Sequence, residues 1–149
     1  MLGAHAILAP VVALVAWSLI VMAWMAATRI PAMKRAGVDL KSRVGGRGLN
    51  LEGVIPDEVN WKAHNYQHLM EQPTIFYAIA IALALMDFGG GINLWLAWAY
   101  VGLRVVHSLV QCTYNRVWHR TLLFMLSSLC LIGLTTHAAL KIAHDCGLI

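Results

Sequence analysis

Residues 61–87 read WKAHNYQHLMEQPTIFYAIAIALALMD and give the clearest indication of the architecture. Their purely apolar part, Thr74–Met86, has 13 residues, which is too short to cross about 30 Å of hydrocarbon as a helix. A membrane-spanning helix here must therefore include polar residues that precede Pro73. The full segment has 27 residues and would form a helix about 40 Å long, bent at Pro73.

The ends of this helix carry capping and turn signals. Asp57 or Asn60 is suited to cap its start, because either side chain can accept a hydrogen bond from a free backbone N–H group. Asp87 shortly precedes a run of glycines, Gly89–Gly91, which predicts the end of the helix.

Three further apolar runs have the length of membrane spans. The run at 6–28 has no formal charge and no Lys or Arg before it, so we expect a retained transmembrane helix and not a signal peptide. The run at 92–112 contains Arg104 and His107, and the run at 121–140 has no formal charge. We therefore predict an all-α membrane protein, a four-transmembrane-helix bundle in a single domain, 1–149. The spans lie at about 6–28, 66–87, 92–112 and 121–140, with a loop at about 29–61.

The composition agrees with a membrane protein. Of 149 residues, 60% are hydrophobic and 12% are charged, with a mean hydropathy of +0.68. An average soluble domain is about 25% charged, so the values exclude a disordered chain and an ordinary soluble enzyme. The three cysteines, Cys112, Cys130 and Cys146, show neither a disulfide framework nor zinc-site spacing.

Basic residues gather on one predicted side of the membrane. Nine Lys and Arg fall in the first and third loops, against one, Lys141, on the other side. The positive-inside rule then places both loops in the cytoplasm and both termini on the non-cytoplasmic side, in what we expect to be a bacterial inner membrane. Trp61 and Trp118 lie near the predicted inner interface and Trp95 near the outer one, as in an aromatic belt. The nine basic residues are Arg29, Lys34, Arg35, Lys41, Arg43, Arg47, Lys62, Arg116 and Arg120.

Polar residues within the spans fall on helix faces. One face of the second helix has residues at i, i+4 and i+7, and one face of the third has residues at i, i+3 and i+7. With two residues that open the fourth helix, these faces define a polar pocket towards the cytoplasmic leaflet. Its many donors and few carboxylates suit an anionic ligand. The residues are His64, His68 and Glu71, then Arg104, His107 and Gln111, then Arg120 and Thr121.

Other interpretations of these residues stay open. Glu71 and Arg104 lie at similar predicted depth and are expected to pair, because a charge inside a membrane needs a partner. A less favoured interpretation is that the set forms a structural network that holds the bundle together. His64, His68 and Glu71 could instead supply three metal ligands, but this signal is weak and we expect no metal.

The motifs resemble those of a known family. His64–Pro73, followed by an apolar helix, resembles the second-helix signature of the MAPEG family, the membrane-associated proteins in eicosanoid and glutathione metabolism. The sequence from Arg104 to His107 is similar to the family's third-helix Arg-x-x-His. Arg120-Thr121 begins thirteen residues after His107, where one member of the family, microsomal prostaglandin E synthase, has an Arg-Ser pair. The resemblance covers nearly the whole chain.

This resemblance implies a homotrimer that binds glutathione between neighbouring protomers near the cytoplasmic face. Glu71 would receive the amino group of glutathione, arginines would hold its carboxylates, and Arg120 or Thr121 would stabilise its thiolate. The implied positions also include Arg29, Arg104 and His107. His64, His68 and Gln111 stand where glutathione-binding members usually have Arg, Asn and Tyr.

Two classes of function follow from the resemblance. The first is a glutathione-dependent transferase or peroxidase-like enzyme that acts on lipophilic electrophiles. The second is a non-catalytic membrane protein of the same fold that binds lipids or other small molecules. A third class, a small exporter, would need Glu71 to cycle protons, but a nearby Arg104 would keep Glu71 ionised.

Overall fold

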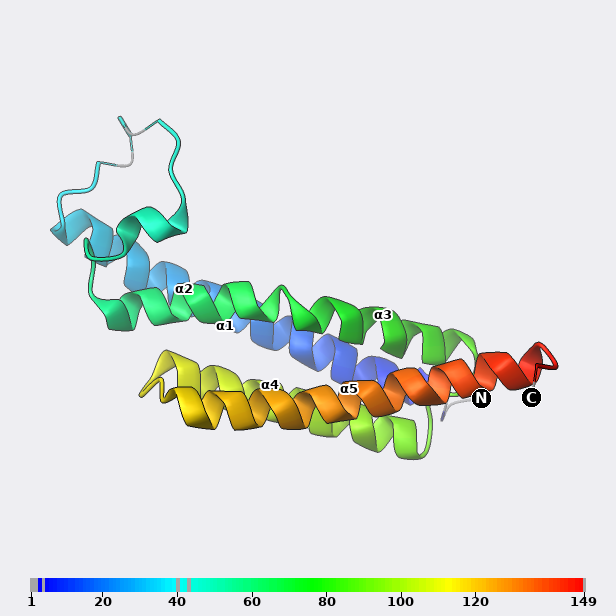
Figure 1. Ribbon diagram of the computed structural model, residues 1–149. Helices are drawn as coiled ribbons and strands as arrows, with labels where there is room; N and C mark the ends of the chain where they lie inside the picture. The colour runs from blue at the N-terminus through cyan, green and yellow to red at the C-terminus, as the bar shows by residue number, and fades with distance from the viewer. Residues whose placement is uncertain (1–2, 4, 40, 43, 149) are drawn as a thin grey trace.

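The computed structural model describes residues 3, 5–39, 41–42 and 44–148, and every regular element in this part of the chain is a helix (Figure 1). A short 3₁₀ turn, η1 (His5–Ile7), leads into α1 (Leu8–Arg35). A second 3₁₀ turn, η2 (Gly48–Leu51), lies in the connection to α2 (Asp57–Leu69). Three more helices follow: α3 (Gln72–Leu85), α4 (Ile92–Cys112) and α5 (Val117–Asp145).

The first helix is longer than the apolar run that predicted it. It continues past Thr28 to Arg35 and ends at Gly37, whose φ of 70° is the left-handed conformation that glycine adopts without strain. The N–H of Gly37 donates to Lys34 O at 3.2 Å and that of Val38 donates to Met33 O at 3.0 Å, which is a Schellman ending. The loop expected at 29–61 is correspondingly shorter, because α2 already begins at Asp57.

The segment expected to form one bent helix is instead two helices. α2 ends at Leu69 and α3 starts at Gln72, and Glu71 between them has φ −92° and ψ −95°. Pro73 is the cause, because it has no N–H to donate four residues back and its ring clashes with that turn. The break reverses which residues face inward: Gln72 is partly buried, while the side chain of Glu71 is 70% exposed.

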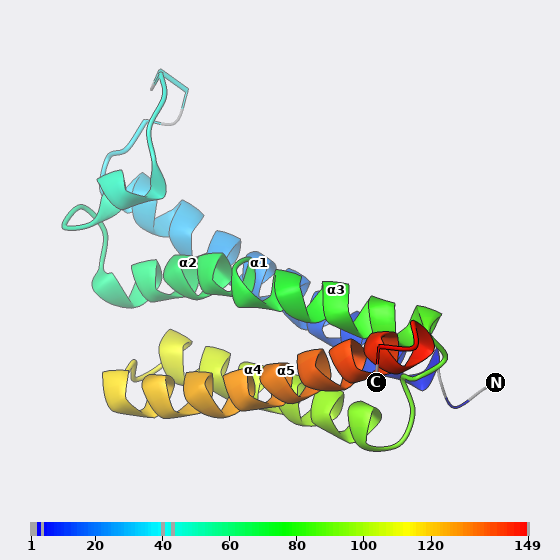
Figure 2. The ribbon, with the colours of Figure 1, turned by 45° about the vertical axis from the view of Figure 1, so that its right-hand side comes forward.

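The helices form an elongated bundle. α4 and α5 run side by side, and α2 and α3 follow each other along α1 (Figures 1 and 2). Both chain ends lie at one end of the bundle, while the α1–α2 connection and the α4–α5 turn lie at the other (Figure 1). α4 has the same bounds as the apolar run at 92–112, whereas α5 extends beyond the run at 121–140 on both sides.

Three helical segments are long and apolar enough to cross a membrane: His5–Arg35, Asp57–Leu85 and Val117–Asp145. The chain is therefore a multi-pass membrane protein. α4 is not among the three, because Arg104, His107 and other polar residues lower its mean hydropathy.

The bundle has a continuous apolar core and an apolar outside. At the centre of the core the rings of Phe76 and Tyr100 stack with centroids 4.4 Å apart, and both residues are 0% exposed. On the outside, Ile20 of α1 and Leu129 of α5 are more than half exposed. Such a surface is suited to contact with lipid chains or with other protomers.

Candidate functional site

A cavity of about 200 Å³ opens beside the α4–α5 turn. Four of its lining residues come from the first two turns of α5, one from the last turn of α2 and one from α4. These are Val117, Arg120, Thr121, Phe124, His68 and His107. Four of the six are residues that the sequence assigns to the polar pocket. The cavity lies at the end of the bundle that also carries the basic α1–α2 connection (Figure 1).

Arg104 is the buried cation beside this cavity. It is 1% exposed, and its guanidinium lies 5.3 Å from the ring centroid of Phe124 and 5.4 Å from that of Tyr100. Arg104 Nε donates to the hydroxyl of Tyr100 at 3.2 Å, and Nη2 donates to Oε1 of Gln72. Hydrogen bonds and aromatic faces thus replace the water that this buried cation lacks.

His68 stands between Arg104 and Glu71. Its Nε2 lies 3.4 Å from Nη1 of Arg104, and its Nδ1 lies 3.2 Å from Oε2 of Glu71. Because Arg104 can only donate, Nε2 accepts and the ring proton is on Nδ1, where it is donated to the carboxylate. The expected direct pairing of Glu71 with Arg104 is therefore wrong in this structure, because the break at Pro73 turns Glu71 outward and the imidazole fills the space between them.

His107 and Gln111 pair with each other inside α4. Nε2 of His107 lies 3.2 Å from Oε1 of Gln111, and both residues are 3% exposed. With Oε1 as the acceptor, His107 carries its proton on Nε2. Its Nδ1 is buried without a hydrogen-bond partner within the described residues. The ring also lies against His68, with centroids 4.9 Å apart, so the two imidazoles form one wall of the cavity.

Arg120 is held in place by the turn that precedes α5. Its Nη1 donates to Oδ1 of Asn115 at 2.7 Å. Asn115 has a φ of 49°, in the left-handed region that asparagine tolerates better than most residues. Nε of Arg120 is buried with no partner among the described residues, and Thr121 lines the cavity next to it. The cavity therefore has two guanidinium groups nearby, and two buried nitrogens beside it, Nδ1 of His107 and Nε of Arg120, have no hydrogen-bond partner among the described residues.

Residues 7–140 match the MAPEG family. The chain belongs to the MAPEG family. Neither the curated proteins nor the solved structures contain a match to it.

The MAPEG match includes all nine predicted site residues, but the structure brings only seven of them to one place. His68, Arg120, Thr121 and His107 line the cavity, and Arg104, Glu71 and Gln111 contact its walls. Two lie apart from them. Nη2 of Arg29 donates to Gly48 O at 2.9 Å beside a separate cavity, and Nε2 of His64 lies 3.2 Å from Oε1 of Glu52.

Sequence reasoning missed three residues of this candidate site. Gln72 accepts from Arg104, and its Nε2 donates to Ser128 Oγ at 2.8 Å. Tyr100 lies one helical turn before Arg104, so extending the i, i+3, i+7 face backwards would have found it. Phe124 lies one turn after Arg120 and faces His68, with ring centroids 5.5 Å apart.

The three residues considered as possible metal ligands do not converge. His68 contacts Glu71, but His64 contacts Glu52 instead of either of them. Within the described residues, no group of three His, Cys, Asp or Glu side chains is placed to hold a metal ion.

Proposed function

We propose that this MAPEG protein is a glutathione-dependent transferase or peroxidase-like enzyme that acts on lipophilic electrophiles at the cytoplasmic leaflet. The observation that carries the proposal is the position of Arg120: anchored by Asn115 at the edge of the cavity, with a buried Nε that lacks a partner within the described residues. Family membership supports a role in glutathione or eicosanoid chemistry.

The proposed chemistry needs a thiolate. A free thiol has a pKa near 8.5 and is mostly protonated at neutral pH, and a neighbouring guanidinium favours the anion. Arg120 would supply this stabilisation, with the hydroxyl of Thr121 as a further donor. In conjugation, the thiolate sulfur forms a bond to an electrophilic carbon, and the leaving group departs with the bonding electron pair. In peroxide reduction, the thiolate sulfur attacks one peroxide oxygen, the O–O bond breaks, and the other oxygen leaves as an alkoxide that takes up a proton to give the alcohol. A second glutathione thiol then attacks the sulfur of the resulting sulfenic acid, which forms the disulfide and releases the oxygen as water.

Arg104 and His107 have supporting roles in this proposal. Arg104 provides a fixed positive charge behind His68, which favours a ligand carboxylate in the cavity. His107 offers its unprotonated Nδ1 as an acceptor for an N–H or S–H group of the ligand. Glu71, largely exposed, would receive the amino group of glutathione.

The proposed functional unit is a homotrimer of four-span protomers, with both termini on the non-cytoplasmic side of a bacterial inner membrane. Arg29 and His64 lie away from the cavity of their own protomer, which is consistent with a site completed between neighbours. α4 would be the fourth span, because it runs alongside α5 over most of its length (Figure 1).

A second candidate is a non-catalytic lipid- or small-molecule-binding protein of the same fold. The observation that favours it is that residues of the site are hydrogen-bonded to one another. Glu71 is hydrogen-bonded to His68, and Nε2 of His107 is hydrogen-bonded to Gln111. Glu71 and His107, which were expected to hold glutathione, therefore already have partners within the protein.

Two measurements on detergent-purified protein separate these candidates: glutathione binding by calorimetry and conjugation of 1-chloro-2,4-dinitrobenzene. Arg120→Ala should reduce turnover about ten-fold or more and leave glutathione affinity nearly unchanged, because its charge acts on the thiolate. Arg116→Ala is the matched control, since Arg116 is exposed at the same end of α5 and outside the cavity. Equal turnover in the wild type and Arg120→Ala, or binding without any turnover, would favour the second candidate.

A further inference from the structure

A larger cavity, of about 480 Å³, lies where α1 ends and α2 begins, away from the candidate site. Its walls are mostly apolar and come from both sides: Ala27, Pro31 and Ala36 from the α1 side, Pro56 and Val59 from the α2 side. The hydroxyl of Thr28, which also lines it, is already bonded to Trp24 O at 3.0 Å and Met25 O at 3.2 Å. The cavity is thus an apolar groove with one charged lining residue.

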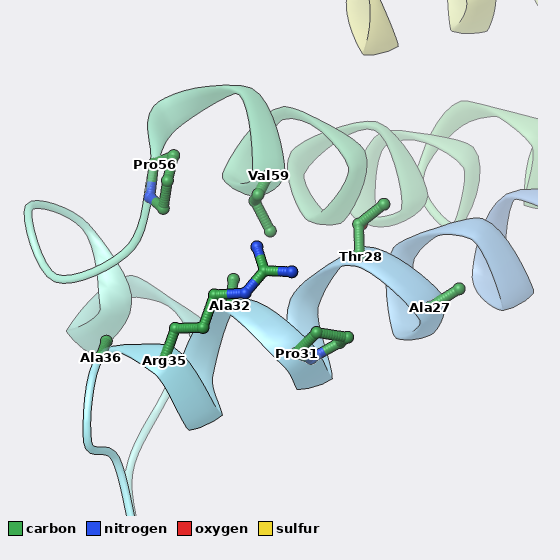
Figure 3. Close-up of a pocket in the computed structure, with 8 residues that line it drawn as sticks. All are labelled: Ala27, Thr28, Pro31, Ala32, Arg35, Ala36, Pro56 and Val59. Atoms are coloured by element: carbon green, nitrogen blue, oxygen red, sulfur yellow. The ribbon is translucent and has the colours of Figure 1, made fainter.

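That charged residue is Arg35. Its side chain reaches back from the last turn of α1, so that the guanidinium lies between the helices and faces Val59 (Figure 3). Arg35 is exposed, and no acidic side chain in the described part of the chain forms an ion pair with it. A cation held over an apolar groove without a protein counter-charge is complementary to an amphiphilic anion.

The cavity lies at the depth of lipid headgroups. The uncharged run of α1 ends at Thr28, and Arg35 follows seven residues later, about 10 Å further along the helix. The polar layer on one side of a bilayer is about 5–8 Å thick, so Arg35 lies near the water-facing limit of this layer. Nearer the apolar run, Lys62 of α2 lies over the ring of Trp24, 5.6 Å from its centroid, and such basic and aromatic residues are typical of the interface.

The charge balance of the surrounding segment is positive. Residues 29–62 contain seven Lys and Arg and four Asp and Glu. Two of the four acids have local partners, since Glu52 contacts His64 and Asp39 accepts from the N–H of Lys41 at 2.9 Å. The other two, Asp57 and Glu58, occupy the first turn of α2, where the helix N-terminus stabilises them.

We propose that this cavity is a binding site for an anionic phospholipid. The lipid phosphate contacts Arg35, and the glycerol and upper acyl carbons lie against Ala27, Pro31 and Val59. A zwitterionic lipid fits less well, because its headgroup ammonium brings a second positive charge into the basic segment. The site shares no residue with the cavity beside Arg120, so it does not depend on the proposed enzyme activity.

The test uses the full-length protein in detergent, titrated with 1-palmitoyl-2-oleoyl-phosphatidylglycerol or with the phosphatidylcholine of the same chains. Native mass spectrometry counts retained lipid, and the unfolding midpoint gives an apparent affinity. Phosphatidylglycerol should bind more tightly. Arg35→Gln should weaken it roughly five-fold, as expected for one cation near an anionic headgroup. Lys41→Gln, which removes the same charge from an exposed loop position outside the cavity, should leave it unchanged.

Two further arms test the groove and the source of the phosphate. Ala27→Leu, which narrows the apolar wall, should weaken the binding of both lipids. Glycerol 3-phosphate should not raise the unfolding midpoint. The proposal is overturned if the two lipids bind equally, if Arg35→Gln binds as the wild type does, or if glycerol 3-phosphate stabilises as well as the lipid. It is also overturned if Ala27→Leu changes the oligomeric mass and not lipid retention, since the groove would then be a contact between copies of the chain.

Discussion

Glu71 and Arg104 are connected through a single imidazole, that of His68, and do not contact each other. The carboxylate is 70% exposed, whereas the guanidinium is buried at 1%. The anion closest to Arg104 in this chain of contacts is therefore the surface carboxylate of Glu71, on the far side of the His68 ring. The two ends of this connection should differ in their importance for stability.

Alanine at Arg104 should lower the free energy of unfolding by roughly 2–4 kcal/mol, because the Tyr100 hydroxyl and the Gln72 amide would stay buried without their partner. Alanine at Glu71 should cost less than about 1 kcal/mol, since an exposed ionic contact contributes little. Unfolding midpoints in detergent, followed by tryptophan fluorescence, would measure both. Equal losses would mean that Glu71 compensates Arg104 directly in the folded protein.

Gln72 should be required for the position of Arg104. Gln72→Leu removes the acceptor for Nη2 and should cost about 1–3 kcal/mol, because a buried charged donor loses its partner. Gln72→Glu keeps an acceptor at the same place and should stay close to the wild type. Ser128→Ala, which removes only the bond from Nε2 of Gln72, is the control and should cost about 1 kcal/mol or less. If the leucine and glutamate variants unfold at the same temperature, the contact with Arg104 is not stabilising.

Asn115 should matter for catalysis through Arg120. Asn115→Gly removes the acceptor for Nη1 but suits the φ of 49°, so the turn should be retained. We expect turnover of a generic electrophile to fall several-fold with glutathione affinity unchanged, because Arg120 is no longer fixed at the cavity. Asn115→Asp keeps the acceptor and should retain most of the turnover. A glycine variant as active as the wild type would show that Arg120 needs no anchor.

Cys146 reports on the orientation in the membrane. It is exposed just after α5, whereas Cys112 is 1% exposed and Cys130 lies within α5. A membrane-impermeant maleimide should therefore label Cys146 in intact cells if the C-terminal end is on the non-cytoplasmic side. Cys146→Ser, analysed in parallel, should abolish the labelling. Labelling that requires disrupted cells would reverse the proposed orientation.

The sequence predicted the helical membrane fold, and family membership confirms the resemblance of its motifs. The predicted helix boundaries were wrong where capping interactions, and not the end of an apolar run, determine the end of a helix. α1 continues through charged residues to Arg35 and is terminated by Gly37, because a helix ends where its carbonyls find other partners and not where apolar residues stop.

Side-chain pairing was less predictable than the helices. Glu71 and Arg104 were expected to pair because they lie at similar predicted depth in the membrane. That expectation assumed a regular helix, and residue spacing no longer predicts side-chain direction where the helix is broken. Because the backbone leaves the helical conformation at Glu71, this side chain lies at the surface and contacts His68, whereas Gln72 takes the inward position. Arg29 and His64 illustrate the same limit, since their loop partners Gly48 and Glu52 belong to a segment without periodic sequence.

Arg104 contacts both of the helices that meet at the break between α2 and α3. One of its guanidinium nitrogens contacts His68 in the last turn of α2, and the other donates to Gln72 in the first turn of α3. A single side chain from α4 thus connects α2 and α3 across the point where the α-helical hydrogen bonding of the backbone is interrupted. A change in the angle between α2 and α3 would therefore break the contact of Arg104 with either His68 or Gln72.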